Sequence, residues 1–202
     1  MWLHLGFASC ALRTRRFDDA AIHARRARTS LAPLTADYDA ARIELALIDA
    51  YLASELDPAG VAPALDIAAR LVESAALPLE DRACFQARVV DQRAYQLNRT
   101  GDHAAALALY ESIPAGVHPF ASYRRDAGRA YGAWRLGRPD ALALATAAIE
   151  HAGDGGYVRL RAMGLLMIAR MLGDAGGEAR ARARAIADRL DDDELRGRAD
   201  RG

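Results

Sequence analysis

The stretch RAYQLNRTGDHAAALALYESIP, residues 93–114, holds two helix patterns that meet at a glycine. Gly101 ends the first pattern, and Asp102 stands where an aspartate side chain caps the first free amides of a following helix. Gly137 and Gly173 follow at equal intervals of 36 residues, and each of them also ends a helix pattern. Equal spacing of such breaks is typical of a helical-hairpin repeat. We also predict a positive φ at Gly101, as the C-terminal turn of a helix often requires.

The composition favours helices over strands. Hydrophobic residues make up 52% of the 202 residues, enough for a packed core, while aromatic residues make up only 6%. Much of the apolar fraction is alanine, which is the best helix former and lets helices approach closely. Long runs rich in valine, isoleucine and threonine, which strands prefer, are absent from the sequence. We therefore predict an all-α fold.

Outward from Gly101, the chain divides into ten helix patterns that form five antiparallel hairpins joined by short turns. We expect Thr35 or Asp37 to cap the third predicted helix. We expect Pro139 to lie in the first turn of the eighth predicted helix. The predicted helices cover about residues 1–14, 17–30, 38–55, 61–75, 79–99, 103–113, 119–136, 139–152, 157–172 and 178–190.

No long polar linker interrupts the chain, so we predict a single domain over residues 1–202. Its end, residues 191–202, is acidic and arginine-rich and is expected to be a solvated polar tail. The chain begins inside a helix pattern with no capping residue before it. Two interpretations stay open, a piece of a longer polypeptide and a misassigned start.

Small residues recur where the paired helices would cross. Around the central turn they are Ala94 and Ala106, followed by Tyr110; the first hairpin has Ala8, Ala20 and Ala27, with Pro33 near its end. This pattern resembles the tetratricopeptide repeat, a helical hairpin of about 34 residues. The resemblance implies a right-handed α-solenoid of about five hairpins. It departs from the family at Leu142, where alanine is expected, at Arg93, which replaces a leucine, and in the second hairpin, which lacks a turn glycine.

The sequence contains no recognisable catalytic or metal-binding motif. Its five histidines form no HxxxH pair, its two cysteines form no CxxC pair, and no phosphate-binding or nucleophile motif is present. We therefore expect no enzymatic activity, no metal and no cofactor. The two separate cysteines fit a reducing cytoplasm, and no apolar run reaches the roughly 20 residues that span a bilayer.

The charge pattern argues against a dedicated nucleic-acid binder. Formal net charge is zero, and all 27 basic residues other than histidine are arginines. Arginines crowd the first and the last hairpin, so local attraction for an acidic partner or a nucleic acid stays open. For most of these arginines a solvated outer face is the simpler interpretation.

The resemblance implies that the first helix of each hairpin lines a concave groove. The groove residues carried over from the family are Arg88, Asp91, Tyr95, Asn98, Arg99, Arg124, Tyr131, Trp134, Arg135, Met167 and Arg170. Arginine, tyrosine, tryptophan and methionine are enriched at binding surfaces. The leading hypothesis is a non-catalytic protein- or peptide-binding scaffold with an acidic partner. The alternative is a ligand-sensing or regulatory domain of a larger bacterial transcriptional or signalling regulator. Self-association is expected, where it occurs, through the N-terminal end.

Overall fold

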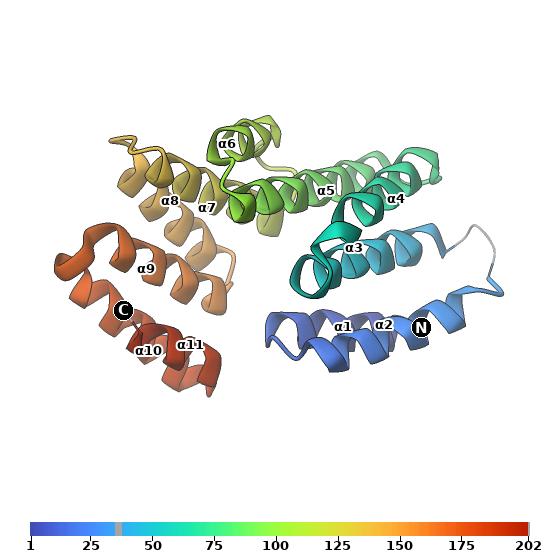
Figure 1. The fold of residues 1–202 in the computed structure, drawn as a ribbon, viewed down its shortest axis with the longest axis horizontal. Coiled ribbons are helices and arrows are strands. Elements are labelled where there is room, and N and C mark those ends of the chain that lie inside the picture. The colour runs from blue at the N-terminus through green and yellow to red at the C-terminus, as the bar shows by residue number, and fades with distance from the viewer. Residues whose placement is uncertain (35–37, 202) are drawn as a thin grey trace. The chain divides into compact units, whose positions relative to one another are not determined.

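The computed structural model describes residues 1–34 and 38–201, and every regular element in these residues is a helix (Figure 1). The chain is all-helical, as its alanine content predicts. The helices are α1 (Trp2–Arg13), α2 (Phe17–Leu31), α3 (Asp39–Leu56), α4 (Val61–Ser74), α5 (Leu79–Thr100), α6 (His103–Ser112), α7 (Pro119–Arg135), α8 (Ala141–Asp154), α9 (Val158–Leu172), α10 (Gly177–Leu190) and α11 (Asp193–Asp200), with 3₁₀ turns at Pro58–Gly60 (η2) and Gly173–Gly176 (η3). The cap predicted at Thr35 or Asp37 lies outside the described residues.

The chain divides into two compact units, Met1–Gln96 and Leu97–Gly202. The boundary falls inside α5, so this helix contributes most of its length to the first unit and its last turn to the second. Unit 1 contains α1 to α4, and unit 2 contains α6 to α11.

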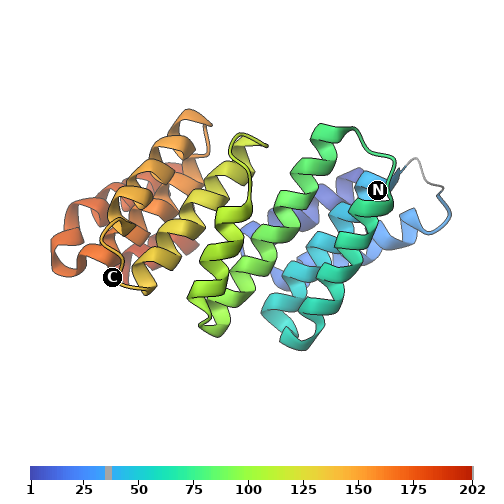
Figure 2. The same cartoon turned by 90° about the horizontal axis from the view of Figure 1, so that it is seen from above.

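In unit 1, α1 packs on α2 and α3 packs on α4, while both α1 and α2 contact α3 (Figure 2). The crossing of α1 and α2 is built on alanine: Ala8, Ala20 and Ala27 are all 0% exposed. A methyl side chain lets two helix axes approach more closely than a larger one would. The small positions predicted in the first hairpin are therefore confirmed as buried.

In unit 2, each helix from α6 to α10 packs on the next one along the chain, and α7 also contacts α9 (Figure 1). Ala106 and Tyr110 of α6 are buried, as predicted. Leu142, which stands where the repeat expects alanine, is 40% exposed, and its neighbour Ala141 is buried in its place. A shift of one residue thus keeps a small side chain at the helix crossing.

The three equally spaced glycines all have a positive φ, which is +93° at Gly101, +69° at Gly137 and +58° at Gly173. After Gly101, the amide of Asp102 donates to the carbonyl of Leu97 over 2.9 Å, which closes the end of α5 in a Schellman motif. The Asp102 carboxylate then accepts from the Ala105 amide at 3.1 Å. Both the positive φ at Gly101 and the aspartate cap of α6 are confirmed.

Two local predictions were wrong. Pro139 lies in the turn before α8, which begins at Ala141 with Asp140 before it. Residues 193–200 of the expected polar tail form α11, in which Leu195 is 1% exposed and Ala199 is also buried. These two residues are four positions apart and share one face of a helix. Two apolar residues among so many charged ones are too few to predict an amphipathic helix from the sequence.

Candidate functional site

The predicted partner-binding residues are divided between the two units. Arg88, Asp91 and Tyr95 belong to unit 1, and the other eight predicted residues belong to unit 2. The structure therefore brings predicted residues together only within each unit.

In unit 1, Arg88 forms a two-pronged ion pair with Glu44 of α3. One guanidinium nitrogen, Nη2, donates to Glu44 Oε2 over 2.8 Å, and Nη1 donates to Oε1. The guanidinium carbon also lies 5.5 Å from the centre of the Phe85 ring. Burial acts to lower the pKa of Arg88, but the hydrogen bond and charge of Glu44 outweigh it and raise that pKa. Arg88 therefore joins α5 to α3, and two of its five N–H donors are used within the fold.

Tyr95 is likewise engaged inside unit 1. Its ring stacks on Tyr51 of α3, with ring centres 6.2 Å apart and planes 7° from parallel. Its hydroxyl lies 3.5 Å from Glu55, which also pairs with Arg15. Asp91 is buried. This part of the predicted set packs helices against one another.

In unit 2, the predicted residues at the α6–α7 packing form an aromatic cluster. Tyr131 meets His103 and Trp134 edge to face, with ring centres 5.8 Å apart in each pair. Arg135 donates to the Tyr131 hydroxyl over 2.8 Å, and Asn98 Oδ1 lies 3.0 Å from His103 Nδ1. Four predicted residues are thus brought together around His103, which the sequence analysis did not select.

The remaining predicted residues lie on three helices. Arg99 and Arg170 are exposed, whereas Arg124 and Met167 are half-buried.

A hollow of about 720 Å³ lies elsewhere, over α9 and between α8 and α10, and none of the eleven predicted residues lines it. We call it the α9 groove. Its lining residues are Thr146, Ile149, Glu150, Gly153 and Asp154 of α8; Arg161, Leu165, Ile168 and Leu172 of α9; and Ala175, Glu178, Ala179 and Arg182 from η3 and α10. A second hollow of about 640 Å³ continues it along α10 to Ile186 and Arg189, and shares Arg161, Leu165 and Arg182 with it.

The floor of the α9 groove is an apolar stripe on α9. Leu165, Ile168 and Leu172 follow one another at the spacing of a single helix face. Leu165 is buried, Ile168 is half-buried and Leu172 is exposed, so the floor opens toward its C-terminal end. A continuous apolar stripe that is only partly covered is the kind of surface on which another helix packs.

The α8 wall of the groove is acidic, whereas the α10 wall carries charges of both signs with a positive excess. Two carboxylates, Glu150 and Asp154, come from α8. From α10 come Arg182 and Glu178 and, in the adjoining hollow, Arg189 and Asp188, of which Asp188 pairs with Arg184. Within the described residues, none of the four side chains Glu150, Asp154, Arg182 and Arg189 forms an ion pair or a side-chain hydrogen bond. The walls therefore keep their charges available to a bound molecule, although Glu178 adds a negative charge at the start of α10.

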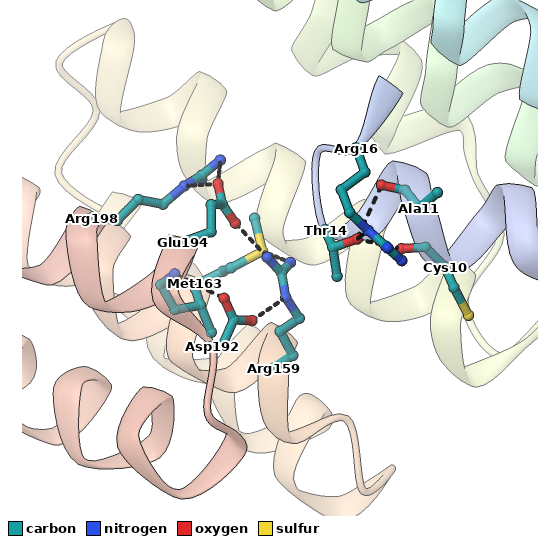
Figure 3. A network of polar contacts seen from close by, with 10 residues as sticks. Cys10, Ala11, Thr14, Arg16, Arg159, Met163, Asp192, Glu194 and Arg198 are labelled. Atoms are coloured by element: carbon teal, nitrogen blue, oxygen red, sulfur yellow. Dashed lines mark hydrogen bonds and ion pairs between the residues drawn. The ribbon is translucent and has the colours of Figure 1, made fainter. Parts of the chain in front are cut away.

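A separate network fastens α11 to α9 (Figure 3). Arg159 donates to Asp192 over 2.8 Å and to Glu194, and Glu194 also accepts from Arg198 at 2.6 Å. Partial burial acts to raise the pKa of Asp192, but the Leu195 amide and Arg159 outweigh it, so this pKa lies below its ordinary value. The network holds the charged terminal helix in place and leaves Arg159 outside the α9 groove.

A second network joins α7 to the helices around it. Asp126 is buried and accepts from His151 of α8 at 2.8 Å, and Arg125 approaches it to 2.7 Å. Tyr123 donates to the carbonyl of Leu160 over 2.8 Å, and its burial raises the pKa of its hydroxyl to about 12. Asp126 orients the His151 ring, but no described residue next to this pair is a nucleophile in contact with it.

No group of three or more histidine, cysteine, aspartate or glutamate side chains in residues 1–34 and 38–201 is placed to hold a metal ion. In the same residues, no helix has the length and apolar character needed to cross a membrane. Comparison with protein-family models, curated proteins and solved structures finds nothing that matches this chain.

The predicted set missed the α9 groove because on α9 it named Met167 and Arg170, which do not line the groove, and because it named no residue of α8 or α10. A signal for it was present: α9 is apolar around most of its circumference, which is typical of a helix covered on more than one side. The wall residues gave no such signal. Charged residues occur throughout the sequence, and only the packing of α8 and α10 on α9 brings these four to the groove.

Proposed function

We propose that this chain is a non-catalytic, protein-binding scaffold of the tetratricopeptide-repeat type, and that its α9 groove accepts one amphipathic helix of a partner protein. Local features within each unit support a repeat of helical hairpins. Alanines occupy the helix crossings, and glycines with positive φ follow α5, α7 and α9. In addition, α1 contacts α3 and α7 contacts α9, so first helices of successive hairpins touch, as stacking of hairpins requires.

The observation that carries the proposal is the combination of an apolar floor with oppositely charged, unpaired walls. Helix-in-groove recognition uses an apolar stripe on the bound helix, and charged flanks then select the partner. A helix lying on Leu165, Ile168 and Leu172 would place one flank beside Glu150 and Asp154. Its other flank would lie beside Arg182 and Arg189. The expected partner helix therefore has a basic flank, an apolar stripe and an acidic flank.

This proposal narrows the acidic partner expected from the sequence. Acidity is required on only one side of the bound helix, the side that faces α10. A uniformly acidic helix would bring negative charge next to the carboxylates of α8, which is unfavourable.

The test uses synthetic helical peptides with a leucine stripe, glutamates along one flank and lysines along the other. Binding to the full chain is measured by fluorescence anisotropy at low and at physiological salt. The peptide whose flanks match the walls should bind, and the double change Arg182→Glu with Arg189→Glu should weaken it by about tenfold or more. Reversing the charges of the acidic flank of the peptide should restore binding to that variant.

The matched control changes Arg25→Glu and Arg26→Glu, two exposed arginines of α2. It alters net charge by the same amount and should leave peptide binding unchanged. Equal weakening by both double variants would show nonspecific attraction and contradict the groove assignment. Loss of binding in Trp134→Ala, with no effect at Arg182 and Arg189, would instead assign the site to the aromatic cluster on α7.

A further inference from the structure

The hairpin of α1 and α2 brings together two histidines that lie 19 positions apart in the sequence. His4 Nδ1 and His23 Nδ1 are 3.2 Å apart, and the ring centres are separated by 5.4 Å. Both residues are half-buried, so the pair is reachable from solvent. Spacing along one helix does not predict this pair, because it forms only when the hairpin closes.

The pair fits the uncharged state of histidine. A hydrogen bond between two imidazole nitrogens needs one protonated and one bare Nδ1. Partial burial, His23 and nearby positive charge, including Arg26, lower the pKa of His4 below its ordinary value. A hydrogen bond of this kind forms with both rings neutral, and neutral imidazole is the form that binds metal ions.

The distance between the nitrogens matches that of two imidazoles on one ion. Zinc binds imidazole nitrogen at about 2.0–2.1 Å, so two such ligands at a tetrahedral angle lie about 3.3–3.4 Å apart. The present separation of 3.2 Å is within about 0.2 Å of this value. Each ring has only to turn so that its lone pair points to the side, where an ion would replace the shared proton.

We propose that His4 and His23 form an open two-histidine site for a divalent transition-metal ion such as zinc, bound through Nδ1 of both rings. The Phe7 ring, whose centre lies 5.1 Å from that of His23, limits the positions that this imidazole can take. The remaining coordination positions of the ion are filled by water or by a donor from outside the chain. The positive charges of the amino group of Met1 and of Arg26 act against a bound cation, so the expected affinity is modest.

The proposal predicts a defined change of tautomer. In the metal-free pair, one ring carries its proton on Nδ1 and donates it to the other. On binding, that proton moves to Nε2, so both neutral rings carry their protons on Nε2 and both Nδ1 lone pairs contact the ion. No bond other than N–H is broken, and no redox partner is needed.

The test is a titration of the full chain with zinc at pH 7.5, followed by imidazole ¹⁵N chemical shifts and by calorimetry. The Nδ1 resonances of His4 and His23 should both move to metal-bound values, with both rings as Nε2–H tautomers. His4→Gln and His23→Gln should each weaken zinc binding by about tenfold or more, and acidification should weaken it because protons compete for the same nitrogens.

Cys10 is exposed and is a competing zinc ligand, so the same titration is repeated with Cys10→Ser. His118→Gln serves as the histidine control, since His118 caps α7 through the Phe120 amide and is not part of the pair. Zinc binding that survives in the His4→Gln, His23→Gln double variant overturns the proposal, as does the absence of shifts at the two Nδ1 atoms in the wild-type chain. Circular dichroism checks that each variant is folded.

Discussion

At the scale of single residues, Gly101 fixes the turn between α5 and α6 through its backbone alone. Its φ is +93°, and a Cβ atom built on it would meet nothing within 4 Å. The cost of a side chain is therefore conformational. We expect Gly101→Val to lower the free energy of unfolding by about 1–2 kcal/mol in chemical denaturation.

The control for this change is Gly6→Val, which also places valine in open space but in the middle of helix α1. Valine is a better helix former than glycine, so this variant should be neutral or slightly more stable. If the two variants were equally stable, the positive φ at position 101 would not require glycine.

Gly128 of α7 is required for a different reason. A Cβ at this position would lie 2.3 Å from Cζ of Tyr110, whose ring is 2% exposed and has no room to move. We expect Gly128→Ala to destabilise the protein by about 1–3 kcal/mol, measured by the shift of the denaturation midpoint. Gly6→Ala, an exposed helical glycine with the same change, should not destabilise it.

The sequence predicted residues whose role is local and missed those whose role depends on a distant contact. Gly101, Asp102 and the buried alanines act within a hairpin, where spacing along the chain shows their function. Gly128 is needed only because the Tyr110 ring lies on it, and His4 meets His23 only across a helix crossing. No pattern along one helix reveals such pairings.

At the scale of elements, α11 is the part of the fold most dependent on charge. The pKa of Asp192 is lowered in the folded state, so its stabilising effect is present above its ordinary pKa of about 3.9 and is lost as pH falls through the lower folded value. We therefore expect α11 to detach from α9 under acid conditions before the rest of unit 2 unfolds. Amide hydrogen exchange of Leu195 as a function of pH measures this.

Asp192→Asn reproduces part of the effect at neutral pH. Asparagine still caps the helix, but the charged bond to Arg159 is lost, at a cost of about 1–2 kcal/mol in local stability. Asp193→Asn is the control because Asp193 is 94% exposed at its side chain and bonds Arg196 at the surface. Similar exchange rates in the two variants would contradict a fastening role for the Arg159 network.

The helix pattern of most of the chain was predictable because apolar periodicity and turn residues agree there. The ends of α2, α5 and α9 fall within about a residue of their predicted positions, close to Pro33, Gly101 and Gly173 respectively. The sequence failed at α11 because its two buried residues are too few to stand out from the charges. It failed at Pro139 because proline before a helix and proline in its first turn look alike.

At the scale of the whole molecule, α5 belongs to both units, since the boundary falls between Gln96 and Leu97. Helix formation is cooperative, so unfolding of the part of α5 in unit 1 should also loosen the last turn of α5 in unit 2. We expect a single calorimetric unfolding transition, with agreement between calorimetric and van't Hoff enthalpies. Two resolved transitions would show that the units unfold independently and would contradict the single domain predicted from the sequence.

The oppositely charged walls of the α9 groove have a consequence for direction. If a bound helix is turned end for end while its apolar stripe stays on the floor, its two flanks exchange places. Its basic side would then face Arg182 and Arg189, and its acidic side Glu150 and Asp154. The groove would therefore accept a flank-matched helix in one polarity only, and so determine which end of the partner chain emerges beside η3 and which beside the end of α8.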